Sequence, residues 1–320
     1  MKRFLLSMAV IAVSITGFYS CSNEEEGINR TANGTANLSI ETEISATGTA
    51  LRSTKSSLSA FGEGSQLGLY VTNGTMGSDY PQGPYNNVMA TLTSGKWVLN
   101  PSVKLGITPA TIFAYYPYNP AQGYTSTNFH VYHTNQVDYM YGTNAEGQGS
   151  INRDNPNVRL RMNHALSLLQ FKISKMNYPG ESKLTRIEVS NASGKMDLKS
   201  SATLDIATGA LTFSDAGYEP AFIENVNGLY NILEPSVAEA DINEVIVIPV
   251  DNVNANGNIL IRFTIDSTVY SYSVPANTSW KQGYKYTYDV LVNGTELVID
   301  DVVITDWQEE ANNGGRIDFY

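Results

Sequence analysis

Few residues in this chain of 320 residues have side chains that could do chemistry on their own. The single cysteine, Cys21, cannot form an intramolecular disulfide, and zinc sites built from two or more cysteines are excluded for the same reason. His130 and His133 would point to opposite faces of a strand, so we do not expect them to share a metal. His164 lies in an apolar stretch, where we expect a hydrogen-bonded core residue.

Patterns typical of enzymes are missing from the sequence. It contains no Gly-x-Ser-x-Gly, P-loop or HExxH motif. Asp300 and Asp301 are adjacent, so on a strand their carboxylates would not point at one substrate. We therefore expect a protein that is not an enzyme and needs neither a metal nor a cofactor.

Cys21 lies directly behind a predicted secretory signal peptide. Lys2 and Arg3 precede an uncharged, mostly apolar run over residues 4–18, which is too short for a membrane span of about 20 residues. Small Ser20 precedes the cysteine, and the local sequence FYSC resembles a bacterial lipobox. We predict signal cleavage between Ser20 and Cys21 and acylation of Cys21 with chains such as palmitate, which would anchor the protein in the outer membrane. The alternative is a free cysteine near an ordinary cleavage site.

The chain behind the signal peptide is acidic. The whole chain has a formal net charge of −11, and the part behind the signal peptide, without Lys2 and Arg3, has −13. This charge disfavours a nucleic-acid partner, which requires a basic surface. The acidic cluster at residues 22–26 (SNEEE) resembles the export signal of surface lipoproteins in Bacteroidota, or it is a solvated spacer. We therefore expect a location at the cell surface.

The elements that carry these residues are predicted to be β-strands. A hydrophobic content of 42% with 20 Tyr and 10 Phe is too high for a disordered chain. Apolar and polar residues alternate between turn pairs such as Asn-Gly, which is typical of an all-β sandwich. Strands are expected at residues 37–44, 66–71, 111–116, 158–173, 184–189, 202–206, 210–213, 244–250, 259–265, 268–274, 285–292, 297–304 and 317–320.

The length suggests about two domains. A turn-rich segment, NYPGE at residues 177–181, is the best boundary. The predicted organisation is a signal peptide (1–20), a polar spacer (21–36), an amino-terminal β-sandwich (37–178) and a carboxy-terminal β-sandwich (179–320).

Several short motifs occur in an order that resembles the fimbrillin family of surface pilus subunits. They are an arginine loop (TALRS, 49–53), a strand after it (64–70), a D-x-x-Y segment (VDYMYG, 137–142), a strand with a central histidine (RMNHALSLLQ, 161–170), and a W-x-x-G-Y-x-Y turn (280–288) with a final TDW (305–307). The resemblance implies two tandem transthyretin-like Greek-key β-sandwiches and a structural role in a fimbrium, with a part in cell adhesion.

The family also implies a mechanism of assembly. In stalk subunits a trypsin-like protease cuts after an arginine beyond the first strand. The first strand then leaves, and the carboxy-terminal strand of a neighbouring subunit fills the groove. The implied partners are other copies of the chain or related pilus subunits, the protease, and a surface ligand of the host or of other bacteria.

The sequence supplies each part of that scheme. The removable strand would present Leu38, Ile40 and Ile44. Cleavage would fall between Arg52 and Ser53, with Arg30 and Lys55 as competing positions. The donor strand would present Ile317 and Phe319.

Two other functions remain open on the sequence. Anchor or tip subunits of a pilus would keep the first strand. A surface lipoprotein that does not polymerise would instead bind glycans or host ligands, for which the tyrosines between residues 115 and 141 offer stacking surfaces.

Overall fold

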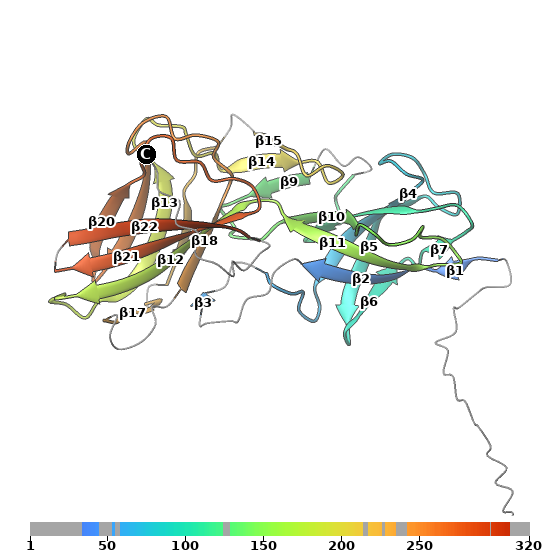
Figure 1. The fold of residues 1–320 in the computed structure, drawn as a ribbon, viewed down its shortest axis with the longest axis horizontal. Helices are drawn as coiled ribbons and strands as arrows, with labels where there is room; N and C mark the ends of the chain where they lie inside the picture. Colours follow the sequence, from blue (N-terminus) through green and yellow to red (C-terminus); the bar gives the residue numbers. More distant parts are fainter. Residues whose placement is uncertain are drawn as a thin grey trace, which may run out of the picture.

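The computed structural model describes residues 34–44, 53–54, 58–123, 129–213, 217–225, 228–234, 242–294 and 296–307. Every regular element in these ranges is a β-strand, which confirms the predicted all-β class. Among the same residues no helix is long and apolar enough to cross a membrane. The molecule is elongated, and two groups of strands follow one another along its long axis (Figure 1). The Greek-key connection of the strands stays a prediction.

The first unit is built on a seven-stranded sheet in the order β2-β11-β10-β8-β4-β5-β6. The strands are β2 (Ser39–Ile44), β4 (Gln66–Thr72), β5 (Tyr85–Thr93), β6 (Lys96–Asn100), β8 (Thr111–Tyr116), β10 (Met140–Asn144) and β11 (Asn157–His164). Only the β2–β11 pair is parallel. The two edge strands of this sheet, β2 and β6, lie close enough for a side-chain hydrogen bond. Trp97 Nε1 on β6 donates to Thr42 Oγ1 on β2 (3.2 Å). Outside the sheet, β1 (Ala36–Asn37) pairs with β7 (Lys104–Leu105).

The second unit is a sandwich of two sheets. One has the order β22-β21-β12-β18-β3, with β3 (Ser53–Thr54), β12 (Ser167–Met176), β18 (Ile242–Val247), β21 (Tyr284–Asn293) and β22 (Glu296–Asp306). The other has β13 (Lys183–Asn191), β16 (Ala221–Glu224), β17 (Tyr230–Asn231), β19 (Ile259–Ile265) and β20 (Thr268–Ser273). Phe171 packs edge-on against Phe263 between the sheets, with ring centres 5.4 Å apart. Trp280 Nε1 donates a hydrogen bond to the Tyr288 hydroxyl (2.9 Å).

A seam joins the two units. Strand β9 (Phe129–Tyr132) lies in the chain between β8 and β10 of the first unit, yet it pairs with β14 (Ser201–Leu204), which pairs with β15 (Leu211–Phe213). Beneath this small sheet lies an apolar cluster with members from both halves of the sequence, among them Tyr70, Tyr115, Phe129, Leu168, Leu204, Ile246 and Trp307. The seam therefore buries side chains of both units in one continuous core.

The chain changes from one sheet to the other at Ala165–Leu166, between β11 and β12. Strand β12 pairs with β18 and β21 of the second unit, ten residues or so before the expected boundary near residue 178. The single strand expected over residues 158–173 is thus two strands in two sheets. The domain limits themselves stay a prediction.

Candidate assembly site

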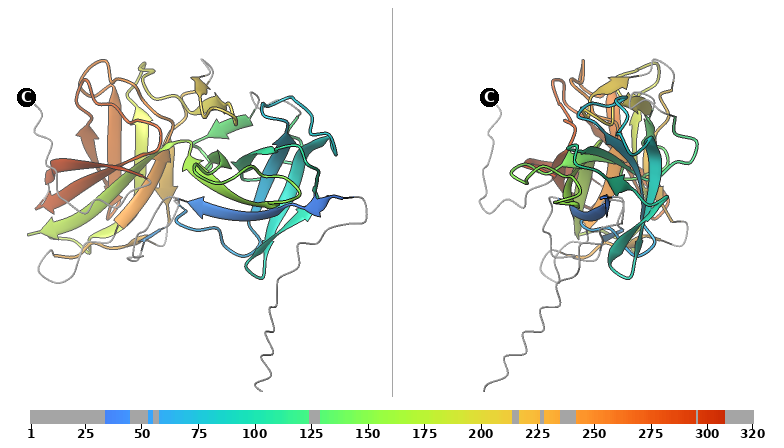
Figure 2. Two further views of the ribbon diagram at one scale, coloured as in Figure 1. Left: turned by 45° about the vertical axis from the view of Figure 1, so that its right-hand side comes forward. Right: turned by 90° about the vertical axis from the view of Figure 1, so that its right-hand side faces the viewer.

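The first described segment, residues 34–44, lies on the outside of the first unit and ends where the two units meet (Figure 2). Side chains on β2 alternate between core and solvent, as they must on a strand. Leu38 is 6% exposed and Ile40 is 5% exposed, and both belong to the core cluster of the first unit. Ile44 is half-buried and packs against the same cluster. The three residues predicted for the removable strand therefore all contact one core.

The backbone of residues 38–44 is hydrogen-bonded to one neighbouring strand and to two further carbonyl groups. Strand β2 pairs with β11 over six residue pairs, from Asn157↔Ser39 to Met162↔Ile44, and it is the terminal strand of its sheet. Before it, Leu38 N donates to Val103 O and Ser39 N donates to Pro156 O, both at 3.0 Å. An edge strand has only one neighbour in its ladder, so it can be replaced without breaking the sheet behind it.

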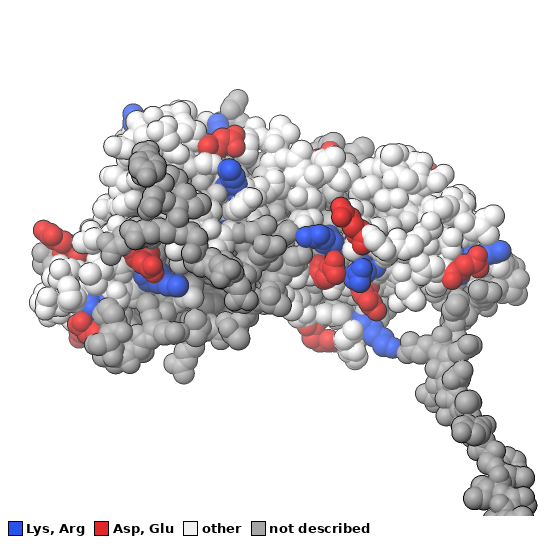
Figure 3. All heavy atoms as spheres, in the orientation of Figure 1, with Lys and Arg blue, Asp and Glu red and all other residues white. Residues whose placement is uncertain are grey.

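The solvent side of the segment carries complementary charges. In register, Glu41 lies opposite Arg159 and Glu43 opposite Arg161. The Arg159 Nε–Glu43 Oε2 distance is 3.4 Å, with both side chains about half exposed. Figure 3 shows basic and acidic groups side by side over the region of β2 and β11. Exposed ion pairs of this kind contribute about 0–1 kcal/mol, so they orient the strand more than they hold it.

Apolar burial dominates the energy of the segment. A fully buried aliphatic side chain contributes about 1.5–3 kcal/mol, so Leu38 and Ile40 together contribute roughly 3–6 kcal/mol. Ile44 adds less because it is half-buried. A domain's whole stability is about 5–15 kcal/mol. Losing this strand would therefore remove a large share of the first unit's stability.

The two sides of the predicted cleavage position belong to different sheets. Ile44 ends β2 in the first unit, whereas Ser53 begins β3, which pairs in parallel with β18 of the second unit. Arg52 lies outside the described residues, as do the predicted lipidation and signal-cleavage residues Ser20 and Cys21 and the predicted donor residues Ile317 and Phe319.

Three of the sequence motifs converge on one buried cluster. His164 Nδ1 lies 2.8 Å from Asp138 Oδ1, and their side chains are 0% and 1% exposed. The indole of Trp307 stacks on the imidazole, with ring centres 4.0 Å apart and planes 1° apart. The other carboxylate oxygen, Asp138 Oδ2, accepts a hydrogen bond from Leu58 N at 2.7 Å. The expected hydrogen-bonded core histidine is thereby confirmed.

The Asp138–His164–Trp307 cluster contacts residues that adjoin two predicted assembly segments, the cleavage segment and the donor segment. A buried carboxylate is tolerated only when hydrogen-bond donors surround it, and here the donors are an imidazole and a backbone amide. Leu58 follows the predicted cleavage segment, and Trp307 precedes the predicted donor segment. Sequence reasoning singled out Asp138, His164 and Trp307 as motif members but not their contact, and it missed Leu58.

His133 is a second buried histidine, and it lies in the seam. Its Nε2 lies 2.8 Å from the Glu219 carbonyl, to which it donates, and its Nδ1 accepts from Ile248 N at 3.3 Å. Burial lowers the pKa of His133 to about 4, so the imidazole is neutral at neutral pH. His130 is exposed on β9, so the two histidines lie in different environments. No group of three metal-ligating side chains occurs within the described ranges.

The fold and the edge strand define an elongated all-β protein of two joined units. The family model for fimbrillin-like proteins matches residues 52–307, and the chain belongs to the fimbrillin-like family. Among curated proteins, none matches this sequence.

Two solved structures of similar fold come from Bacteroides species. A candidate cell adhesion protein of Bacteroides uniformis has a TM-score of 0.60 and 16% identity, with 87% of this chain and 99% of that chain covered. A candidate cell adhesion protein of Bacteroides ovatus has a TM-score of 0.56, 16% identity and the same coverage of 87% and 99%. At this identity the similarity shows the fold alone.

Proposed function

We propose that the protein is a structural subunit of a surface pilus, or fimbria, with a role in adhesion. In this proposal it is exported as a lipoprotein acylated at Cys21 and assembles by strand exchange between subunits. The observation that carries the proposal is the edge position of β2. Leu38, just before this strand, and Ile40 within it fill the core, while the backbone of β2 pairs only with β11 in the sheet.

Cleavage after Arg52 by a trypsin-like protease would begin assembly. The cut would separate β2, in the first unit, from β3, in the second, so the first strand would no longer be tied covalently to the rest of the chain. Its departure would expose the core between β11 and the β6 edge. A neighbouring subunit would then supply a strand, which is the strand-addition mode of recognition.

The end of the chain has the pattern that this groove requires. Ile317 and Phe319 are two residues apart, as Leu38 and Ile40 are, and so would point into the core from one face. Asp318 would then face outward, toward the side where Arg159 and Arg161 now face glutamates. Because donor and groove belong to different parts of the subunit, the contacts run head to tail and build an open filament.

Limited proteolysis tests this function. The chain from Ser22 onward would be treated with limiting trypsin, run unboiled on a denaturing gel, and its fragments weighed by mass spectrometry. We expect a ladder of polymers only after the segment ending at Arg52 is lost, and we expect Arg52→Gln to abolish the ladder. Arg30→Gln serves as the matched control and should polymerise normally.

Other outcomes would separate the remaining roles. Assembled fibres whose subunits still begin at Cys21 would contradict strand exchange through removal of β2. A chain that is cut after Arg52 but stays monomeric would contradict a stalk role and favour a subunit that does not polymerise by itself, such as an anchor or a tip.

A further inference from the structure

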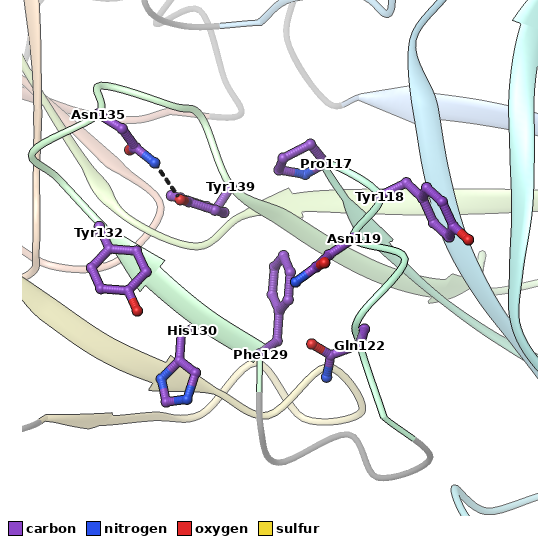
Figure 4. A pocket seen from close by; sticks show the side chains of 9 residues that line it. All are labelled: Pro117, Tyr118, Asn119, Gln122, Phe129, His130, Tyr132, Asn135 and Tyr139. Atoms are coloured by element: carbon purple, nitrogen blue, oxygen red, sulfur yellow. Dashed lines mark hydrogen bonds between the residues drawn. The ribbon is translucent and has the colours of Figure 1, made fainter.

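A cleft of about 320 Å³ opens on the seam between the two units (Figure 4). One wall is the segment after β8, which contributes Pro117, Tyr118, Asn119 and Gln122. The other wall is β9 with the turn that follows it. The volume falls at the lower end of the range found for small-ligand pockets.

The lining of this cleft is uncharged and rich in both rings and amides. None of its nine described residues is Asp, Glu, Lys or Arg. The aromatic members include Phe129 and Tyr132, and the amides are Asn119, Gln122 and Asn135. An ionic ligand would have to leave its water without meeting an opposite charge, which is costly. The lining therefore suits a neutral ligand that has both apolar and hydrogen-bonding groups.

Two rings on β9 form a shelf at one side of the cleft. His130 and Tyr132 are alternate residues, so they share the solvent face of the strand. Their ring centres are 6.4 Å apart with planes inclined by 34°, and Tyr132 is 42% exposed. Pairing between β9 and β14 fixes the backbone beneath them. Figure 4 shows both rings across from Gln122, with Phe129 between the two walls.

The opposite side of the cleft carries two amide side chains, Asn119 and Gln122. Gln122 is 9% exposed, and its Nε2 has no hydrogen-bond partner among the described residues. The Tyr70 hydroxyl lies beside the Gln122 amide and donates to the Gly123 carbonyl (2.6 Å). The Gln122 amide nitrogen is shielded from solvent, so the amide on this wall that a ligand meets directly is that of Asn119, which is exposed at the rim.

We propose that this cleft binds a neutral saccharide. The apolar C–H face of a pyranose ring would stack on Tyr132 and His130, and its hydroxyl oxygens would accept from the exposed amide of Asn119. The cleft lies on β9, away from the β2 edge, so this binding does not depend on strand exchange.

The test uses the uncleaved chain from Ser22 onward. It would be applied to an array of neutral oligosaccharides ending in galactose, glucose, mannose or N-acetylglucosamine. Sialylated and sulfated counterparts and a proline-rich peptide complete the array. Saturation-transfer NMR with the strongest hit measures affinity. We expect a neutral glycan to bind, and Tyr132→Ala and Asn119→Ala each to weaken it at least tenfold.

Tyr284→Ala is the matched control, because Tyr284 is similarly exposed (38%) but lies on β21. It should bind as the wild type does, and all variants should show the wild-type melting temperature. The proposal is overturned if no neutral glycan binds, if sialylated or sulfated glycans or the peptide bind better, or if Tyr284→Ala loses as much affinity as Tyr132→Ala. Asn119→Ala keeps the test decisive if Tyr132→Ala fails to fold.

Discussion

At the scale of single residues, the Asp138–His164–Trp307 cluster is the most constrained part of the molecule. Asp138 accepts from the backbone of Leu58 and from His164, and Trp307 covers the imidazole. All of these side-chain groups are shielded from water, so removing one partner leaves the others unpaired in a medium that cannot replace it.

Asp138→Ala should therefore be strongly destabilising. It leaves the Leu58 amide and the His164 imidazole without their acceptor, and each unpaired buried group costs about 1–3 kcal/mol. We expect a loss of roughly 2–5 kcal/mol in the free energy of unfolding, measured by urea denaturation. Asp289→Ala, at an exposed position on β21, should change stability by less than about 0.5 kcal/mol. Equal losses in the free energy of unfolding for the two substitutions would contradict a stabilising role of the cluster.

His133 predicts a pH dependence whose sign follows from its buried neutral state. The unfolded chain takes up a proton near pH 6.5, whereas the folded chain does so only near pH 4, because burial lowers the pKa of His133. Stability should fall as the pH drops from 6.5 to 4, by roughly 3 kcal/mol at about 1.4 kcal/mol per pH unit. Carboxylates with lowered pKa values, such as Glu188, add their own loss at lower pH, below about 4.5.

Melting temperatures recorded between pH 8 and pH 4 would check this dependence. His133→Gln should flatten the curve between pH 6.5 and 4, since glutamine does not titrate. His130→Gln is the control, because His130 is exposed, and it should keep the wild-type slope. A wild-type slope in His133→Gln would contradict the assignment.

At the scale of elements, the first strand should matter through its inward side chains only. Ile40→Ala removes buried apolar volume and should cost about 2–4 kcal/mol. The neighbouring Glu41→Ala, on the exposed face, should cost less than about 0.5 kcal/mol. Urea titrations of the uncleaved chain compare the two. Comparable costs would mean that β2 is not packed as the account requires.

The sequence predicted many strands well where alternation was strong, as for β8, β19 and β20. It missed β5, which begins with two asparagines after its first tyrosine, because pairing with β4 and β6 holds that strand in place. It also read β11 and β12 as one strand. The break between them arises because the chain passes from one unit to the other, which local alternation does not encode.

The candidate site was predictable in its parts but not in its assembly. The alternation at Leu38 and Ile40 predicted a strand with one apolar face, and the burial of both side chains is as expected. The contact between Asp138, His164 and Trp307 joins positions far apart in the sequence, so only the packing of the two units could reveal it. The cleft beside β9 likewise depends on a strand that the sequence did not predict.

At the scale of the whole molecule, the seam should make the two units unfold together. They share the β9–β14–β15 sheet and one apolar cluster, and Gln136 both donates to Ile246 O and accepts from Ile246 N, each at 2.8 Å. Differential scanning calorimetry should show one transition for the uncleaved chain. Gln136→Ala should broaden or split it, whereas Gln282→Ala, whose amide bonds a single loop carbonyl, should not. Two separated transitions in the wild type would contradict this coupling.

Strand exchange also predicts how two subunits assemble when each lacks one half of the mechanism. One partner is a donor, the Arg52→Gln chain left without protease, which keeps its own first strand. The other is an acceptor, a chain that ends at residue 311 and is cut after Arg52, so it has an open groove but no donor strand.

Mixing these two subunits is the most direct measurement of the central claim. The account predicts a 1:1 heterodimer that survives an unboiled denaturing gel and grows no further, while neither subunit assembles by itself. Heterodimers should disappear when the donor also carries Phe319→Asp. A mixture that stays monomeric, or a donor or acceptor that forms a ladder alone, would contradict assembly by exchange of the first strand for the last.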